Sequence, residues 1–278
     1  MSTLAFEPAA WAGLLLCALG VALAPATAQT PPPSPPTSAA PAAPAAPAAP
    51  AAPAWPAAAA EPPAVEGRAY TPGDFDAIEI SGAAHVRFRQ GESESVFVEG
   101  DEAAQKAVTV EVRGGQLFIR PAGSWKFWTS RRIQVNVTAR DLKRVSISGA
   151  ADLLATLPVA LGQLQISISG AGLARFDQLK AEQLSFHVSG SGDGQMAGQV
   201  EQLDVRVSGR SDFRGADLMA QRARVRVSGL ADVKVWAVQE LAVTVSGVGT
   251  VDYFGNPAVQ RNTSGIARLN ARGPKTPP

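Results

Sequence analysis

Residues 205–212, VRVSGRSD, and residues 225–232, VRVSGLAD, decide the fold of this chain. In both stretches valine alternates with a polar residue up to a Ser-Gly step. Successive side chains of a β-strand point to opposite faces, so the valines would line a dry face and the arginines a wet one. The stretches therefore predict strands that end at a sharp bend, where glycine tolerates a positive φ and serine can bond the backbone.

The same pattern recurs at a nearly constant interval through the second half of the chain. Its Ser-Gly steps are separated by 21, 20, 19, 20, 18 and 18 residues. A period of this kind indicates stacked repeats, because one repeat cannot bury its apolar face alone. The steps are Ser148-Gly149, Ser169-Gly170, Ser189-Gly190, Ser208-Gly209, Ser228-Gly229, Ser246-Gly247 and Ser264-Gly265.

Aligned repeats place aliphatic residues in columns. One column precedes the steps and consists of Ile147, Ile168, Val188, Val207, Val227 and Val245. A second column follows them and consists of Leu153, Ala174, Phe213, Val233 and Val251, with Gly194 as an interruption. We predict an all-β fold, a single-chain parallel β-helix that we expect to be right-handed, with about seven rungs of about 20 residues stacked about 4.8 Å apart.

The first residues predict export. Residues 1–28 have the pattern of a secretory signal peptide, because the apolar run Trp11–Ala24 precedes the cleavage signal Ala26-Thr27-Ala28. Retention as an uncleaved anchor is the alternative, although the run is shorter than the roughly 20 residues that a membrane helix needs. Cys17 follows Leu16 instead of a small residue, so we expect no lipid anchor. We expect a periplasmic or cell-surface protein of a bacterium, with no transmembrane span after cleavage.

The rest of the chain divides by composition. Residues 29–73 are rich in proline and alanine and predict a disordered linker, since proline fixes φ and lacks an amide donor. Residues 74–144 predict a β-rich region with one short helical turn at 101–107. The solenoid repeats span 145–272, and residues 273–278 predict a disordered tail.

Several motifs match a known family. They are Phe75-Asp76-Ala77-Ile78, Ile80-Ser81-Gly82 and Tyr253-Phe254-Gly255-Asn256-Pro257, together with the serial Ser-Gly steps. On these residues the chain resembles the head GIN domain family, a domain of unknown function labelled an auto-transporter adhesin. The resemblance implies an extracytoplasmic β-solenoid, mostly of bacteria, with no assigned activity and no catalytic residues. Self-export needs a translocator barrel of many strands, which we do not expect in the residues after 272.

One loop is a candidate binding patch. It consists of Trp125, Lys126, Phe127, Trp128, Arg131 and Arg132, which would present aromatic rings beside cationic groups. Such rings favour contact with sugars and membrane interfaces. The alternative is that the loop folds back and caps the open end of the solenoid, because exposed strand edges invite unwanted pairing.

Aspartates recur four residues after the serine of several steps. They are Asp152, Asp193, Asp212 and Asp232. Stacked carboxylates could bind Ca²⁺, which prefers oxygen ligands. Leu173 and Thr250 break the column, however, and aspartate also suits a turn by bonding its own backbone. We interpret the aspartates as turn residues and predict no metal and no cofactor.

Other charged residues on the wet face have structural interpretations. The arginines that share a face with Asp204 are Arg206, Arg224 and Arg226. We expect lateral ion pairs between neighbouring rungs, each of which contributes little. His85 and His187 have no acidic partner that the sequence identifies, and every serine is explained by the repeat. We therefore predict no catalytic residues.

The net charge of +1 gives no concentrated basic surface for nucleic acid. We predict a non-enzymatic binding, adhesion or scaffold module of the cell envelope, with an envelope glycan or an envelope protein as its partner. One alternative is a carbohydrate-active β-helix enzyme of the polysaccharide lyase or hydrolase type, since a fold does not determine a function. The other is a structural solenoid that assembles end to end. The ligand and the oligomeric state stay open.

Overall fold

The computed structural model describes residues 66–122 and 133–276, which belong to one unit, Ala59–Pro278. Within them the chain forms seventeen strands and one short helix. The predicted signal peptide, most of the predicted linker and the predicted aromatic loop lie outside the described residues. No helix in the described part of the chain is long and apolar enough to cross a membrane.

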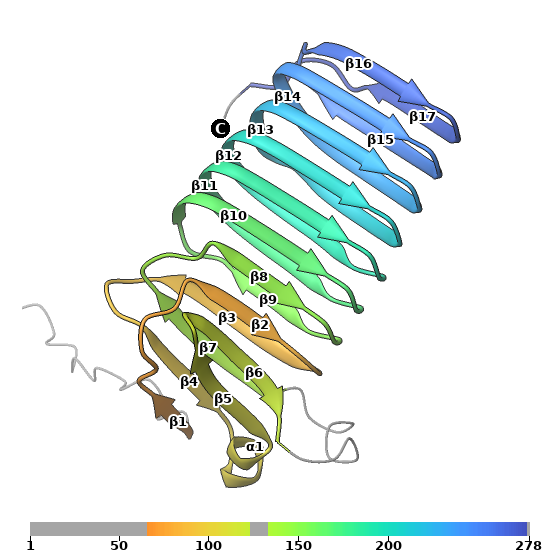
Figure 1. Ribbon diagram of the computed structural model, residues 1–278. Coiled ribbons are helices and arrows are strands. Elements are labelled where there is room, and N and C mark those ends of the chain that lie inside the picture. Colours follow the sequence, from red (N-terminus) through yellow and green to blue (C-terminus); the bar gives the residue numbers. More distant parts are fainter. Residues whose placement is uncertain (1–65, 123–132, 277–278) are drawn as a thin grey trace, which may run out of the picture. The chain divides into compact units, whose positions relative to one another are not determined.

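The repeats wind into a parallel β-solenoid of about six turns, which confirms the predicted fold class (Figure 1). Strands that lead into the Ser-Gly corners form a first sheet, and strands that leave the corners form a second sheet. The long strands belong to both sheets because each bends around the opposite, rounded edge. The strands of the repeats are β8 (Arg144–Ile147), β9 (Asp152–Ala155), β10 (Val159–Ile168), β11 (Leu173–Val188), β12 (Asp193–Val207), β13 (Arg210–Val227), β14 (Leu230–Val245), β15 (Val248–Phe254), β16 (Ala258–Thr263) and β17 (Ile266–Ala271).

The Ser-Gly steps lie one above another and form the corner edge of the solenoid. At each level the backbone bonds to the rung below; the Ser208 amide, for example, donates to the Val188 carbonyl oxygen at 2.8 Å. The prediction that the repeat glycines take a positive φ is wrong, since none of the seven does. Glycine is required because a Cβ on Gly209 would lie 1.9 Å from the Gly190 carbonyl oxygen.

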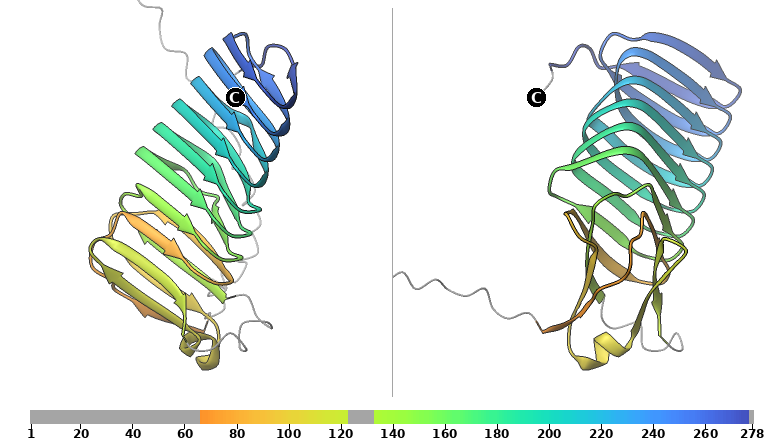
Figure 2. Two further views of the ribbon diagram at one scale, coloured as in Figure 1. Left: turned by 45° about the vertical axis from the view of Figure 1, so that its right-hand side comes forward. Right: turned by 60° about the vertical axis from the view of Figure 1, so that its left-hand side comes forward.

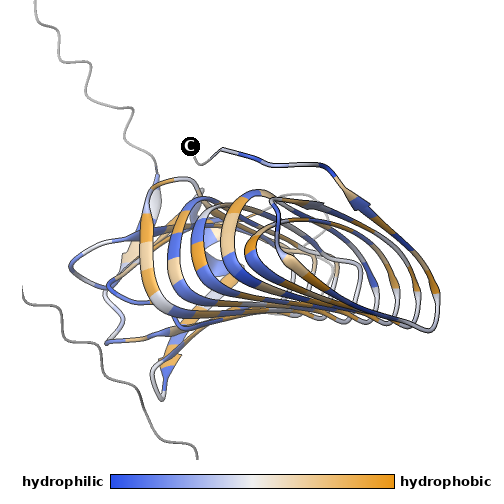
Figure 3. Ribbon diagram, turned by 90° about the horizontal axis from the view of Figure 1, so that it is seen from above, coloured by the Kyte–Doolittle hydropathy of each residue, from blue (hydrophilic) through white to orange (hydrophobic). Residues whose placement is uncertain are grey.

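The aliphatic columns form the dry interior. Val188, Val207 and Val227 are paired in register on neighbouring rungs. Each of them is only 2% exposed. Viewed along the solenoid, the ribbon alternates between hydrophobic and hydrophilic residues, as the strand pattern predicts (Figure 3). One continuous core therefore runs through all the turns.

Gly194 interrupts its column for a packing reason. The rings of Phe186 and Phe213 meet beside it, with their centroids 5.1 Å apart. A Cβ on Gly194 would lie 2.7 Å from the Phe186 ring and 2.9 Å from the Phe213 ring. The missing side chain thus provides space for two fully buried aromatic rings, and the core stays filled.

The region at residues 74–144 shares both sheets with the repeats. β2 and β3, joined at Ser81-Gly82, form the rung directly beneath β8 and β9, and β6 and β7 form the rung below that. The antiparallel strands β5, β4 and β1 close this end of the sheets (Figure 2). The elements are β1 (Gly67–Tyr70), β2 (Ala77–Ile80), β3 (Ala84–Gln90), β4 (Ser95–Glu99), α1 (Glu102–Lys106), β5 (Val108–Arg113), β6 (Gln116–Pro121) and β7 (Ile133–Ala139).

Two segments that the sequence predicts to be disordered contact the solenoid. β1 lies within the predicted linker and pairs with β4, because no proline occurs between Pro63 and Pro72 and the amide donors are available. Residues 273–276 follow β17 and also lie against the fold, where Lys275 bonds to Asp217. The predicted boundaries of linker and tail are corrected accordingly.

The unequal spacings of the steps are absorbed at the rounded edge. The pairing of β11 with β12 shifts register between Phe176 and Leu179, and then runs unbroken from Gln183 to Val188. The pairing of β13 with β14 also shifts between Gly215 and Met219. The two faces beside the corner edge are therefore the regular part of the molecule, and side chains repeat there from rung to rung.

Candidate binding faces

The outer face of the first sheet is basic in its central rungs. The second half of β13 reads RARVRV, and its strand alternation buries Ala223 and Val225. The intervening arginines point outward and are exposed. Together with an arginine of β12 they form what we call the arginine face, which consists of Arg206, Arg222, Arg224 and Arg226.

The arginine face contains few compensating carboxylates. The Asp204 carboxylate lies 3.0 Å from the Arg206 guanidinium and 3.4 Å from that of Arg226, so two arginines share one acid. The lateral pairing predicted for Arg206, Arg224 and Arg226 is confirmed for Arg226 alone, because Arg206 pairs within its own strand. Arg222 and Arg224, by contrast, form no ion pair with any described residue, although Glu240 lies in register with Arg222. The face therefore carries uncompensated positive charge.

Hydroxyl groups line the arginine face along the corner edge. A groove of about 590 Å³ runs here between the corner serines and the outward residues next to them. The Ser208 hydroxyl donates to the Val188 carbonyl oxygen at 3.2 Å, which leaves its lone pairs toward solvent. Burial lowers the pKa of His187, and the Arg206 charge lowers it further, so the imidazole is neutral at pH 7.

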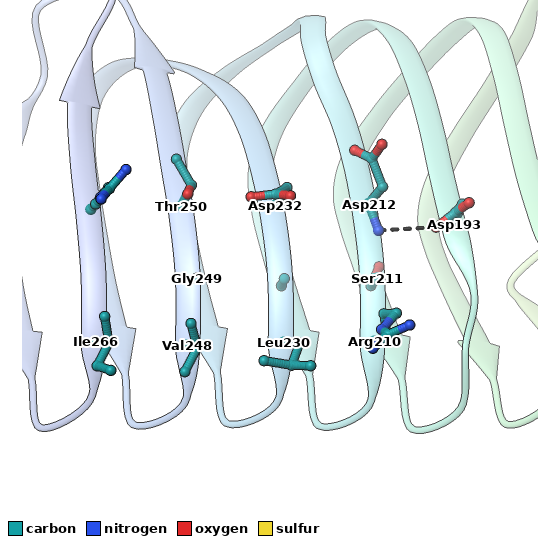
Figure 4. A pocket seen from close by; sticks show the side chains of 12 residues that line it. Asp193, Arg210, Ser211, Asp212, Leu230, Asp232, Val248, Gly249, Thr250 and Ile266 are labelled. Carbon is teal, nitrogen blue, oxygen red and sulfur yellow. Dashed lines mark hydrogen bonds between the residues drawn. The ribbon is translucent and has the colours of Figure 1, made fainter.

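The second sheet presents a different groove, of about 530 Å³, beside the same edge (Figure 4). The first residue after each of the last three corners is aliphatic and exposed: Leu230 at 45%, Val248 at 45% and Ile266 at 72%. These side chains are in register on neighbouring strands. We call this row the aliphatic ridge. The alternation of the strands does not predict this ridge, although its residues follow the Ser-Gly steps directly.

Next to the aliphatic ridge runs the column of aspartates that the sequence singled out. The Asp193 carboxylate accepts a hydrogen bond of 3.0 Å from the Asp212 amide. The Asp212 carboxylate in turn accepts one of 2.7 Å from Arg214. These contacts differ from the predicted bonding of each aspartate to its own turn, because one joins neighbouring rungs and the other is an ion pair along the strand. Among the described residues, no three acidic, histidine or cysteine side chains are grouped so that they could hold a metal ion.

The histidines lie on opposite sheets. His85 is on β3 in the second sheet, with Nδ1 3.1 Å from an Asp152 carboxylate oxygen. The local sequence does not predict this acidic partner, because the pair forms between residues that are 67 positions apart in the chain. His187 lies on the first sheet. The structure therefore does not bring the two imidazoles together.

The predicted aromatic patch, Trp125 to Arg132, falls outside the described residues. The strands on either side of it, β6 and β7, are described. β6 lies beneath β2, and the Ser81 amide donates to the Ile119 carbonyl oxygen at 2.9 Å. β7 lies beneath β3. β6 and β7 therefore form the level below β2 and β3 in the two sheets.

The family described as "putative auto-transporter adhesin, head GIN domain" matches residues 74–257 of the chain. The chain belongs to this family. The match covers the region at residues 74–144 and most of the repeats of this head GIN domain, including the Tyr253–Pro257 motif. No curated protein matches the sequence.

Solved structures share the fold of this head GIN domain. A protein from Bacteroides fragilis described as a "putative adhesin" is 19% identical, with a TM-score of 0.70 over 74% of this chain and 96% of that one. A "putative lipid binding protein" from Parabacteroides distasonis is 20% identical, with a TM-score of 0.58 over 74% and 96%. A "putative adhesin" from Parabacteroides merdae is 20% identical, with a TM-score of 0.55 over 76% and 96%. None of these descriptions names an enzyme.

Proposed function

We propose that this protein is an exported, non-enzymatic binding module of the bacterial envelope and that its arginine face binds an anionic glycan of the envelope. The family description and the adhesin descriptions of similar folds support a binding role. The signal-peptide pattern and the Pro/Ala-rich linker support export and standoff from the attachment point. The proposal includes a location in the periplasm or on the cell surface.

The observation that carries the proposal is the uncompensated charge of the arginine face. Guanidinium groups bind carboxylates, phosphates and sulfates through paired hydrogen bonds, and they are less strongly hydrated than ammonium groups. Outward arginines on one strand repeat about every 6.8 Å, and neighbouring strands lie about 4.8 Å apart. A polymer with regularly spaced anionic groups can therefore contact several guanidinium groups together.

The shape of the face favours an extended ligand. Pockets for small molecules are concave and bury most of the ligand. The groove beside the corner edge on the first sheet instead crosses several successive rungs of the solenoid. Serine, threonine and arginine side chains are among the residues that line it. Hydroxyls and guanidinium groups in such an array match the hydroxyls and acidic groups of a polysaccharide.

The two alternative functions have less support. The described residues in register beside the His85–Asp152 pair are Gln134 and Leu173, neither of which carries a hydroxyl or thiol nucleophile. End-to-end assembly would require a dry last rung. Arg261 instead occupies the register position of Val243 there and brings a charge to the open end.

The test compares two double variants with equal loss of charge. Arg222→Gln with Arg224→Gln removes charge from the arginine face, and Lys234→Gln with Arg268→Gln removes it from the second sheet. We expect the first variant to bind polygalacturonate at least tenfold more weakly than the unmodified protein, and the second to bind within twofold. Neutral dextran should bind to none of them. Equal weakening in both variants, or none in the first, would contradict the proposal.

A further inference from the structure

The residues after β17 run back along the rounded edge of the solenoid. The Gly255 amide donates to the Gly273 carbonyl oxygen at 3.0 Å, and the Arg272 amide donates to the Tyr253 carbonyl oxygen at 2.8 Å. Gly255 has φ +97°, and a Cβ there would lie 2.0 Å from the Ala237 carbonyl oxygen. The glycine of the Tyr253–Pro257 motif thus permits a turn whose amide anchors the returning segment.

The returning segment ends in a cage for an ammonium group. The Lys275 Nζ lies 5.3 Å from the centroid of the Trp236 ring and 5.4 Å from that of Phe254. It also donates to the Ala216 carbonyl oxygen at 2.7 Å and to an Asp217 carboxylate oxygen at 2.5 Å. Two aromatic faces, a carboxylate and a carbonyl are the groups that recognise an alkylammonium ion.

The cage joins three successive rungs. Ala216 and Asp217 belong to β13, Trp236 to β14 and Phe254 to β15. The lysine side chain is 30% exposed, whereas Trp236 is 2% exposed. Trp236 stands in the column of Lys180, Gln199 and Met219 on the rungs below, and it is not among the residues of the continuous core. The segment that follows β17 therefore covers an apolar surface that would otherwise face solvent.

A groove of about 700 Å³ continues from the cage along the same edge. Lys275 and Thr276 line one end of it, and residues of the bends of β11 and β12 line the rest, among them Lys180 and Gly198. Gly273 turns the chain with φ +90°, and Pro274 then fixes its own φ and offers no amide donor, so residues 274–276 enter the groove without strand pairing. Aromatic-lined grooves are the usual docking sites of extended proline-containing peptides.

We propose that the rounded edge of β11–β15 is a docking site for an extended peptide that contains lysine next to proline, and that the chain's own residues 273–276 occupy it as a strap. The ligand class follows from the cage, which selects the ammonium group, and from the groove beyond Thr276, which accepts extended backbone. The strap ties the last turns to β13. A competing peptide of the same kind displaces it.

The first test supplies the strap in trans. A variant that ends at Gly273 is titrated with a fluorescent peptide of residues 272–278, and the full chain is titrated in parallel. We expect the shortened chain to bind at least tenfold more tightly, because an attached segment competes at an effective concentration on the order of millimolar. The Lys275→Ala peptide should bind at least tenfold more weakly. Equal binding by both chains, no binding by a shortened chain that melts cooperatively, or equal affinity of the two peptides overturns the proposal.

A second test leaves the chain at full length, in case the shortened chain does not fold. Phe replaces Trp11, Trp55, Trp125 and Trp128, so that fluorescence reports on Trp236 alone. Lys275→Ala should raise acrylamide quenching of Trp236 at least twofold. Lys275→Arg should leave quenching close to that of the parent, because a guanidinium also stacks on aromatic rings. Unchanged quenching in Lys275→Ala contradicts the strap.

Discussion

At the scale of single residues, the two members of a Ser-Gly step have different tasks. The glycine permits the close approach of successive rungs, since its missing Cβ would collide with a backbone carbonyl. The serine adds a hydroxyl hydrogen bond to the rung below and presents its oxygen to solvent. The step is therefore conserved along this chain's repeats for a steric reason at one position and a polar reason at the other.

A pair of substitutions separates these tasks. Gly209→Ala should lower the free energy of unfolding by about 3 kcal/mol or more, because the collision is with backbone that cannot move without separating the rungs. Ser208→Ala should cost only about 0.5–1.5 kcal/mol, the range for one exposed-edge hydrogen bond. Urea unfolding of both variants measures the difference. Similar losses in the two variants would refute the steric role of the glycine.

The residue pattern predicts the inward aliphatic columns, but it does not predict how the core packs where a column is interrupted. The break at Gly194 is visible in the sequence. Which rings fill the space depends on the distance between the two sheets and on the register across them, and neither follows from the local pattern. The same limit applies to the cage, where Trp236 and Lys275 are 39 positions apart in the sequence.

At the scale of elements, one charge cluster joins the turn after β3 to the end of β7. The Arg140 guanidinium donates to both oxygens of the Glu94 carboxylate at 2.9 Å and also to Asp74 at 2.8 Å. These hydrogen bonds lower the pKa of Glu94 from its ordinary value of 4.5 to about 2. The folded state thus holds the carboxylate in its charged form.

The lowered pKa predicts a loss of stability in acid. A carboxylate whose pKa is depressed on folding stabilises the fold above the unfolded value, and this contribution is lost as the pH falls from about 4.5 toward about 2. Glu94→Gln should therefore melt lower than the parent at pH 7, and the gap should close by pH 2. Glu92→Gln is the exposed control. A gap that persists at pH 2 would show that the charge of Glu94 is not the cause.

The loop between β6 and β7 gives a second prediction at this scale. It contains the aromatic and cationic residues of the predicted binding patch. If it contacts the ligand, Trp125→Ala with Trp128→Ala abolishes glycan binding and leaves the melting temperature nearly unchanged. A large loss of stability would instead identify the loop as a cap. Calorimetry and a binding titration on the same variant distinguish the two roles.

The order of the lowest rungs could not be predicted from the sequence. The strands around Ser81-Gly82 were expected to precede the solenoid, but they form a rung between β6–β7 and β8–β9. In chain order this rung comes first, the rung beneath it comes second, and the rung above it comes third. The chain enters the third rung at Lys143, whose amide donates to the Asp76 carbonyl oxygen at 2.7 Å. The alternation of apolar and polar residues predicts each strand. The position of the β2–β3 rung between two later rungs depends instead on contacts between distant segments.

At the scale of the whole molecule, the two ends of the solenoid have different protection against pairing with other strands. Antiparallel strands and α1 close the lower end. No strand of the described residues covers the upper end, and Arg261 stands there in the column that carries Val243 on the rung below. A charge at an inward position discourages a strand edge from pairing with another molecule. This arrangement explains why a regular stack need not polymerise.

Removal of that charge should expose the tendency to associate. Arg261→Val continues the aliphatic column to the open end, so we expect mass to rise with concentration in light scattering. Arg268→Val, on the outward face of the neighbouring strand β17, is the matched control and should stay unchanged. A monodisperse Arg261→Val protein at all concentrations would mean that other features protect the end.

An anionic glycan bound to the arginine face should shield the guanidinium groups that it contacts. The direct measurement is residue-level protection from an arginine-specific reagent such as phenylglyoxal, read by mass spectrometry with and without polygalacturonate. We predict that the polymer protects Arg222 and Arg224 several-fold and leaves Arg210 and Arg268 of the second sheet as reactive as before. Equal reactivity of Arg222 and Arg224 with and without bound polymer, or protection confined to the second sheet, would contradict the account.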